Sequence, residues 1–313
     1  MDPTPITAAH TWWVCDFNPF IIPAWSSWLP IRWYGLAYVA GVVCGGLLLW
    51  RWSKRDRLPL TSTAISDLMV ALAVGIIAGG RLGYCLFYKP YLFTEFGGGF
   101  PWWGVLKVTE GGMASHGGII GIVLATWWWW RGRARTVNPL VIADAVAAAA
   151  PIGIIFGRLA NFWNGELWGR PTQVAWAWIF PLSGNPPVPR HPSQLYAVFL
   201  EGLLILAIVL PIHARHRRPG LSLGLVLILY SFGRITGEFF REPDAGQPGG
   251  QPASIVINGV THVVQQPFIL GIFTKGQALT LIVAAVGLGF VIWALRRKPR
   301  PEDYLAAPAA AAK

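Results

Sequence analysis

The sequence "IRWYGLAYVAGVVCGGLLLWRWSKR" at residues 31–55 is an apolar run that ends in a cluster of basic residues. The run at 31–50 is long enough to cross about 30 Å of hydrocarbon as an α-helix. The rest of the chain has the same character, since 54% of its 313 residues are hydrophobic and only 12% are charged. This composition indicates an integral membrane protein and excludes an ordinary soluble domain.

Six further apolar runs follow the first one. Together they predict seven membrane-spanning helices, at residues 31–50, 65–87, 114–130, 140–157, 195–212, 221–239 and 277–295. The run at 114–130 is short for a span, but its flanking tryptophans at 127–130 extend it into the membrane interface. We therefore expect an all-α integral membrane protein of seven transmembrane helices.

Basic residues predict the orientation of these spans. The segments that follow spans one, three, five and seven hold 15 of the 25 lysines and arginines, which is typical of cytoplasmic loops. The N-terminus and the loops after spans two, four and six are then expected outside, and the C-terminus in the cytoplasm. The net charge of +11 is explained by this rule and by anionic membrane lipid, so no nucleic-acid partner is indicated.

The spans divide the chain into three parts. Residues 1–30 are rich in aromatic residues and proline, which predicts an outward segment in the headgroup layer. Residues 31–296 form the membrane domain, with outward loops at 88–113, 158–194 and 240–276. Residues 297–313 are expected to be a cytoplasmic tail without fixed structure.

Two local patterns add detail. Asn258-Gly259 lies between β-branched residues, which predicts a small β-hairpin near 254–264. The cysteines Cys15, Cys44 and Cys85 have no paired spacing, so the sequence indicates neither a disulfide nor a metal site. Cys15 also lacks small residues ahead of it, and is not expected to be a lipid-attachment site of this chain.

Ionisable residues within membrane spans are costly, so each one is a functional candidate. Arg81, Asp144 and Glu201 lie in spans two, four and five. Arg234 and Glu238 share one face of span six, where they could equally form a buried ion pair without further function.

His116 lies among glycines at the start of span three, and both a proton-transfer role and a hydrogen bond at a helix start fit this place.

The stretch "GRLANFWNGELWGRPT" at 157–172 places polar groups at the outer end of span four. Arg158 offers a fork of donors that matches phosphate oxygens, and Asn161, Asn164 and Glu166 follow it. This pattern predicts a site for an anionic lipid headgroup. A helix end closed by polar caps is the alternative interpretation.

These motifs together resemble the prolipoprotein diacylglyceryl transferase family. The stretch "GRLANFWNGELWGR" is similar to the signature of that family. Further similar stretches follow in the family's order: "IRWYGLAYVAG" at 31–41, "GGRLGY" at 79–84, "EGGMASHGGIIG" at 110–121, "RHPSQLYA" at 190–197 and "GRITGEFFREPD" at 233–244. The resemblance covers about residues 31 to 295. Ala160, Trp163 and Ala197 depart from the usual pattern, and Trp163 is expected to narrow the groove beside Arg158.

The resemblance implies a seven-span enzyme of the bacterial cytoplasmic membrane whose active site faces the outer side. It implies transfer of the diacylglyceryl group of phosphatidylglycerol to the lipobox cysteine of a prolipoprotein, with a thioether and glycerol phosphate as products and without a metal or cofactor. The implied catalytic residues are His116, Arg158 and Arg234. The implied substrate-binding residues are Tyr34, Asn161, Glu166, Gly169 and Glu238.

Two other classes of protein stay open on the residues alone. A lipid-binding scaffold or a transporter would spread its polar residues through the depth of the bilayer, whereas most motif residues here concentrate toward one side. A membrane enzyme that transfers another lipid-derived group would share the same site and differ only in its acceptor.

Overall fold

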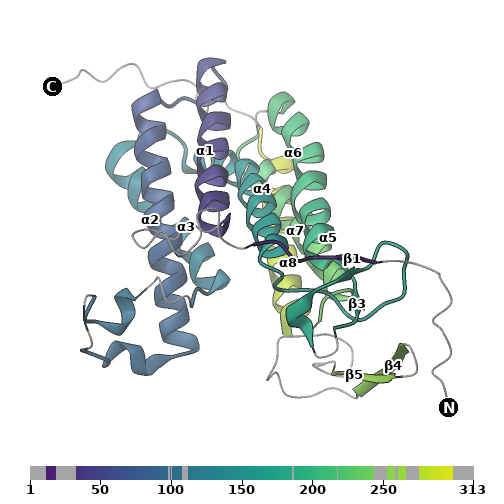
Figure 1. Ribbon diagram of the computed structural model, residues 1–313. Coiled ribbons are helices and arrows are strands. Elements are labelled where there is room, and N and C mark those ends of the chain that lie inside the picture. The colour runs from purple at the N-terminus through teal and green to yellow at the C-terminus, as the bar shows by residue number, and fades with distance from the viewer. Residues whose placement is uncertain are drawn as a thin grey trace, which may run out of the picture. The chain divides into compact units, whose positions relative to one another are not determined.

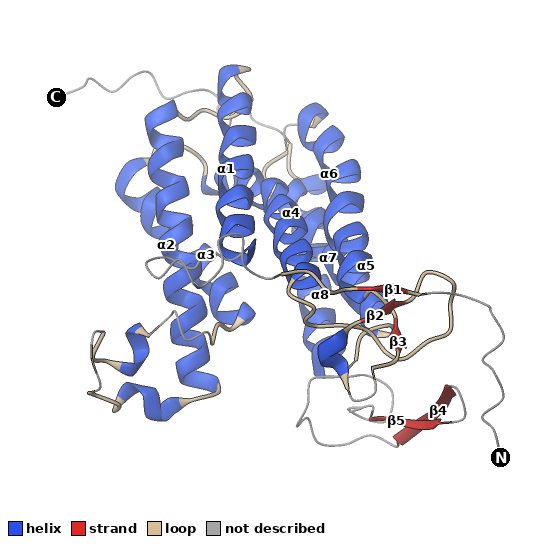
Figure 2. Cartoon of the chain, viewed as in Figure 1, coloured by secondary structure: helices blue, strands red, loops and turns tan. Residues whose placement is uncertain are grey.

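Helices make up most of the computed structural model, and strands are confined to two short sheets (Figure 2). The structure describes the following residues: 12–18, 33–97, 99, 101–107, 112–184, 187–216, 218–242, 252–257, 260–265 and 275–298. Within helix α3 and in the hairpin strands only the backbone is described for some residues, His116 among them.

Each predicted span coincides with a helix. The helices are α1 (Trp33–Lys54), α2 (Ser62–Phe87), α3 (Ser115–Arg133), α4 (Pro139–Trp163), α5 (Ser193–Ala197), η5 (Val198–Leu203), α6 (Leu204–Arg215), α7 (Leu221–Glu238) and α8 (Lys275–Arg296). The α5, η5 and α6 segments are continuous and form one span, Ser193–Arg215.

Five of these helices are long and apolar enough to cross a membrane by themselves. They are α1, α2, α4, α7 and the helix Ser193–Arg215, while the apolar part of α8, Thr280–Arg296, is shorter. A helical membrane fold is thereby confirmed. The count of seven spans and the orientation of the termini stay predictions.

The chain forms two compact units. One contains residues 1–45, 147–216 and 221–297, and the other contains residues 46–146, 217–220 and 298–313. Helices α1 and α4 contribute to both units. The residues of the candidate site described below belong to the first unit, except for His116, which belongs to the second.

Glycines set the packing of the second unit. Gly75 and Gly79 of α2 face Gly117 and Gly121 of α3 so closely that an added Cβ at any of the four would overlap backbone atoms of the other helix. The Gly-x-x-x-Gly spacing of each pair keeps both glycines on one helix face, which lets the two backbones approach.

Two ionisable residues of this unit hold backbone in place. Arg81 of α2 donates to the carbonyl oxygens of Val105 (2.8 Å), Gly104 (2.7 Å) and Gly112 (3.2 Å), and so fixes the loop that leads to α3. Asp144 of α4 is 1% exposed and accepts from the backbone N–H of Gly220 at 2.8 Å. Both side chains thus have local partners that satisfy their charge in part.

In the first unit, α7 and α8 also pack through glycine. A Cβ at Gly224 would lie 2.7 Å from the carbonyl oxygen of Gly287, and a Cβ at Gly287 would lie 2.8 Å from the carbonyl oxygen of Gly224. Because both positions lack a side chain, these helices pack backbone against backbone.

A small sheet, which the sequence did not predict, lies beside the start of α5 (Figure 1). Its strands are β1 (Trp13–Val14), β2 (Trp178–Ile179) and β3 (Pro189–Arg190), with β1 parallel and β3 antiparallel to β2.

Cys15, the residue after β1, is buried with Phe162 and Phe180. Burial raises the pKa of the Cys15 thiol to about 11, with a contribution from Asp16. This thiol is therefore a poor nucleophile at neutral pH.

The predicted hairpin is present. Strands β4 (Pro252–Ile257) and β5 (Val260–Gln265) are antiparallel, and the register pairs Ile257 with Val260. The N-terminal segment outside residues 12–18 and the tail beyond residue 298 lie outside the described residues.

The close glycine contact between α2 and α3 predicts that one added side chain there strongly lowers the stability of the protein. We expect Gly121→Val to lower the free energy of unfolding by about 3 kcal/mol, because the backbone of α2 leaves no room for it. Gly132→Val on the same helix is the control, since an added Cβ there meets nothing within 4 Å. The readout is the temperature at which the buried thiol of Cys85 becomes reactive in detergent. If the Cys85 thiol became reactive at the same temperature in both variants, the close contact of α2 and α3 at Gly121 would be contradicted.

Candidate functional site

The signature stretch begins where α4 ends. The N–H of Gly165 donates to the carbonyl of Phe162 (2.9 Å), and the N–H of Glu166 donates to the carbonyl of Asn161 (3.0 Å). Gly165 has φ +60°, the left-handed conformation that this type of helix end requires. The sequence thus turns sharply after Trp163, and the residues that follow run back across the end of the helix.

Side chains reinforce this turn. The amide of Asn161 donates to Glu166 Oε1 at 2.8 Å, and Asn164 lies 3.5 Å from the same oxygen. Tyr34 of α1 lies close enough to interact with both Asn161 and Glu166. The contact between Asn161 and Glu166 joins two side chains, so the helix cap and the headgroup site both stay predictions.

The next residue carries backbone strain. Leu167 has φ +57°, a region that costs a residue with a side chain about 1–2 kcal/mol. Two side chains at the start of α5 hold it there: Ser193 donates to the carbonyl of Leu167 (2.8 Å), and Gln194 donates to that of Glu166 (2.7 Å). The "RHPSQLYA" stretch therefore fixes the backbone of the signature stretch.

Gly169 lies where three segments meet. Its N–H donates to the carbonyl of His191 (2.9 Å), and it forms a bridge with Arg241 after α7. A Cβ on Gly169 would lie 2.5 Å from the oxygen of His191 and 2.6 Å from that of Phe240. Only glycine lets these backbones come together.

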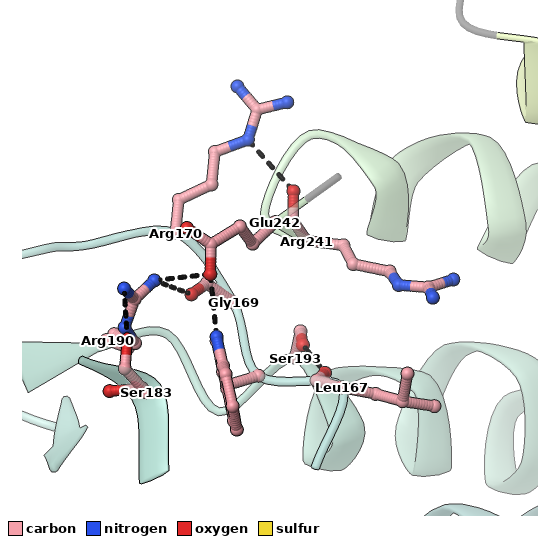
Figure 3. A network of polar contacts seen from close by, with 9 residues as sticks. Leu167, Gly169, Arg170, Ser183, Arg190, Ser193, Arg241 and Glu242 are labelled. Carbon is pink, nitrogen blue, oxygen red and sulfur yellow. Dashed lines mark hydrogen bonds and ion pairs between the residues drawn. The ribbon is translucent and has the colours of Figure 1, made fainter. Parts of the chain in front are cut away.

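An ion pair locks this junction (Figure 3). Arg190 donates to Glu242 Oε2 at 2.7 Å and to the carbonyl of Gly169 at 3.2 Å, and the indole N–H of Trp168 donates to the same Glu242 oxygen at 2.6 Å. The sequence predicts a solvated cluster of Arg241, Glu242 and Asp244 at the outer surface, and Asp244 lies outside the described residues. That interpretation is wrong for Glu242, whose partners lie 52 and 74 positions away.

His191 lies in the same junction. Burial and the nearby Arg170 lower its pKa below the ordinary value, and its Nδ1 lies 3.0 Å from the hydroxyl of Tyr196. Arg170 in turn donates to the carbonyl of Arg241 at 3.0 Å. These contacts hold the segment that carries Arg241 against the signature stretch.

Three arginines line one small cavity. Its volume is about 20 Å³, and its walls are Arg158, Leu167, Ser193, Gln194, Ala197, Glu201, Arg234, Gly237 and Arg241. Figure 3 shows the side chains of Arg241 and Leu167 directed to the same side, away from Arg190. The structure thus brings together Arg158 and Arg234, both predicted site residues, and adds Arg241, which the sequence places only in a solvated cluster.

Two carboxylates offset part of this positive charge. Arg158 lies 3.0 Å from Glu201 Oε2, and Arg234 lies 2.8 Å from Glu238 Oε2. The ion pair of Arg234 with Glu238, one of the two interpretations of their spacing, is present. This contact is an ion pair without an aligned hydrogen bond, since Glu238 Oε2 has no hydrogen-bond partner among the described residues.

Glu201 comes from an unusual piece of helix. It is 1% exposed and lies in η5, a single π-helical stretch inside an otherwise α-helical span. Such π turns are frequent at functional sites because the extra residue redirects the side chains that follow. Tyr230 of α7 also interacts with Glu201, Arg158 and Arg234.

This cavity has the chemistry of an anion site. Its walls carry three guanidinium groups, and guanidinium forks match the oxygens of phosphate. Within the described residues, no three His, Cys, Asp or Glu side chains come close enough to hold a metal ion.

The other predicted site residues lie outside the cavity walls. Tyr34 and the Asn161–Glu166 pair are at the end of α4, and Gly169 is in the junction. His116 is the second residue of α3, and its side chain lies outside the described part of the structure. Trp163 packs on Phe17 and Trp33, with ring centroids 5.7 and 6.1 Å away, and is not among the residues that line the cavity.

The fold and the cavity define a helical membrane protein with a cationic site at the end of its apolar helices. The family model for prolipoprotein diacylglyceryl transferase matches residues 23–293. The chain belongs to the prolipoprotein diacylglyceryl transferase family.

Individual relatives agree with the family model over most of their length. The phosphatidylglycerol--prolipoprotein diacylglyceryl transferase of Rhodospirillum rubrum is 42% identical over 86% of this chain and 90% of its own. The proteins of the same name from Methylocella silvestris and Bradyrhizobium diazoefficiens are 42% and 39% identical, over 87% and 88% of this chain and 93% and 92% of their own.

The buried pair of Arg158 and Glu201 predicts a large and coupled effect on stability. We expect Glu201→Gln to lower the free energy of unfolding by about 3 kcal/mol, because it leaves a buried guanidinium without its counter-charge. The double change with Arg158→Gln should cost less than the sum of the two single changes.

The control is Asp67→Asn, which removes the exposed ion pair with Arg133 and should cost less than about 1 kcal/mol. Thermal unfolding in detergent measures all four variants. Additive effects of the Arg158 and Glu201 changes would mean that the pair does not hold the site together.

Proposed function

We propose that this chain transfers the diacylglyceryl group of phosphatidylglycerol to prolipoproteins, the activity for which its relatives are named. The observation that carries the proposal is the cavity lined by Arg158, Arg234 and Arg241, whose guanidinium groups match the phosphate oxygens of an anionic lipid. All three arginines belong to stretches that resemble the family.

The proposed reaction is a displacement at carbon. The thiolate of the lipobox cysteine attacks the glyceryl carbon, a carbon–sulfur bond forms, the carbon–oxygen bond to phosphate breaks, and glycerol phosphate leaves with the electron pair. The leaving phosphate gains negative charge, so guanidinium groups placed around it stabilise the transition state more than the bound substrate.

Phosphate must open the site in order to bind. The cavity of about 20 Å³ admits little more than a water molecule. A phosphate would therefore displace Arg158 from Glu201 and accept hydrogen bonds from the Arg158 guanidinium in its place. Glu201 and Glu238 then hold the arginines in place while the site is empty. Arg241 is the third donor of the proposed phosphate site.

The acceptor thiol needs a base, because its ordinary pKa of about 8.5 leaves it mostly protonated at neutral pH. We assign this role to His116. The turn residues Asn161, Glu166 and Gly169, together with Tyr34 and Glu238, position the substrate and the arginines.

The proposal includes an arrangement in the membrane. All seven predicted spans cross the bacterial cytoplasmic membrane, with the N-terminus outside and the C-terminus inside. The arginine cavity then faces the outer side, where the signal peptides of prolipoproteins emerge with the lipobox cysteine. Neither a metal nor an organic cofactor takes part in this proposal.

A peptide assay tests the reaction. The full-length protein in detergent is incubated with phosphatidylglycerol and a lipobox peptide, and mass spectrometry follows the addition of diacylglyceryl to the peptide. We expect Arg158→Gln and Arg234→Gln each to lower kcat/KM at least about 100-fold. Arg55→Gln, an exposed arginine at the end of α1, should leave the rate unchanged.

His116→Gln tests the base separately. Its activity should fall at neutral pH and recover in part as pH rises toward the thiol pKa, since hydroxide then deprotonates the peptide. An unmodified peptide with folded wild-type protein would favour a lipid-binding scaffold or a transporter. Full activity of both arginine variants would overturn the phosphate site.

A further inference from the structure

The second unit has a long apolar groove along α2 and α3. Its volume is about 1250 Å³. The floor consists of small residues such as Gly75, Ala78 and Gly121, where the two helices touch, and exposed side chains such as Val74 and Leu124 form its sides. Between Asp67 and Phe87 the groove follows α2 for about 30 Å, the thickness of the hydrocarbon core of a bilayer.

One end of the groove is strongly basic. Arg131, Arg133 and Arg135 line it together with a single carboxylate, Asp67. Asp67 pairs with Arg133, whereas the guanidinium of Arg131 lies 5.0 Å above the ring of Trp127 and Arg135 donates to the carbonyl of Arg131. The positive charge at this end therefore exceeds the negative charge, and all three arginines are exposed.

An unpartnered donor lies in the same wall. Trp129 lines the groove and is 2% exposed, and its indole N–H has no hydrogen-bond acceptor among the residues that the structure describes. A buried indole N–H normally has a partner, so this one indicates an acceptor that comes from elsewhere. The residue lies two positions from Arg131, at the boundary between the apolar groove and its basic end.

We propose that this groove is a binding site for an anionic phospholipid. One acyl chain lies along the small residues between α2 and α3, the phosphate lies among Arg131 and Arg135, and a phosphate or ester oxygen accepts the Trp129 N–H. The groove shares no residue with the arginine cavity of the first unit, so the proposal does not rest on the proposed transferase activity.

Photo-crosslinking tests the site directly. The full-length protein in nanodiscs receives phosphatidylglycerol with a diazirine in one acyl chain, or phosphatidylcholine with the same chain. Crosslinks are located on the peptides of α2 and α3 by mass spectrometry. We expect the phosphatidylglycerol probe to label the groove at least about 10-fold more than the phosphatidylcholine probe.

Two variants probe the proposed contacts. Arg131→Gln with Arg135→Gln should lower labelling by phosphatidylglycerol about 30-fold, because two cations near the headgroup are lost. Trp129→Phe keeps the ring but removes the N–H, and should lower labelling about 5-fold. Arg51→Gln with Arg55→Gln changes the net charge equally at the end of α1 and should have no effect.

Protection of the Cys85 thiol shows that each variant is folded. Equal labelling by the two probes, or an equal loss in the Arg51/Arg55 control, would overturn the proposal and identify the groove as a place for unselected boundary lipid. Crosslinks confined to the first unit would also overturn it.

Discussion

The structure of the first unit depends on how positive charge is held among apolar helices. Arg158, Arg234 and Arg241 line one cavity, and burial of unpaired guanidinium groups is costly. Glu201 and Glu238 offset two of these charges at 3.0 and 2.8 Å. The π turn that carries Glu201 is a local departure from regular helix at the place where this compensation is made. The three guanidinium groups along the cavity make an anionic substrate its natural occupant in our proposal.

The backbone around the cavity comes from three distant stretches of the sequence. The signature stretch turns at Gly165, is pinned by Ser193 and Gln194, and meets the end of α7 at Gly169. The ion pair of Arg190 and Glu242 closes the junction. Arg241 is held next to the other two arginines because its neighbours on both sides are fixed by this network. The strained backbone of Leu167, which lines the cavity, is maintained by the same contacts.

Local patterns in the sequence were sufficient for the helices and part of the site. Apolar runs predicted the helices, and the i,i+4 spacing of Arg234 and Glu238 allowed the ion pair that these residues form. Contacts between distant residues were beyond such patterns. Strand β1 pairs over two residues with a segment more than 160 positions away, and Glu242 finds Arg190 only through the fold. Arg241 looked like a surface charge for the same reason.

In our proposal the three arginines hold the phosphate of phosphatidylglycerol. The most direct measurement is an experimental structure of the full-length protein in nanodiscs that contain phosphatidylglycerol. We expect phosphate oxygens within about 3 Å of the guanidinium nitrogens of Arg158, Arg234 and Arg241, with Arg158 moved away from Glu201. A headgroup bound elsewhere, with the pair of Arg158 and Glu201 intact, would contradict it.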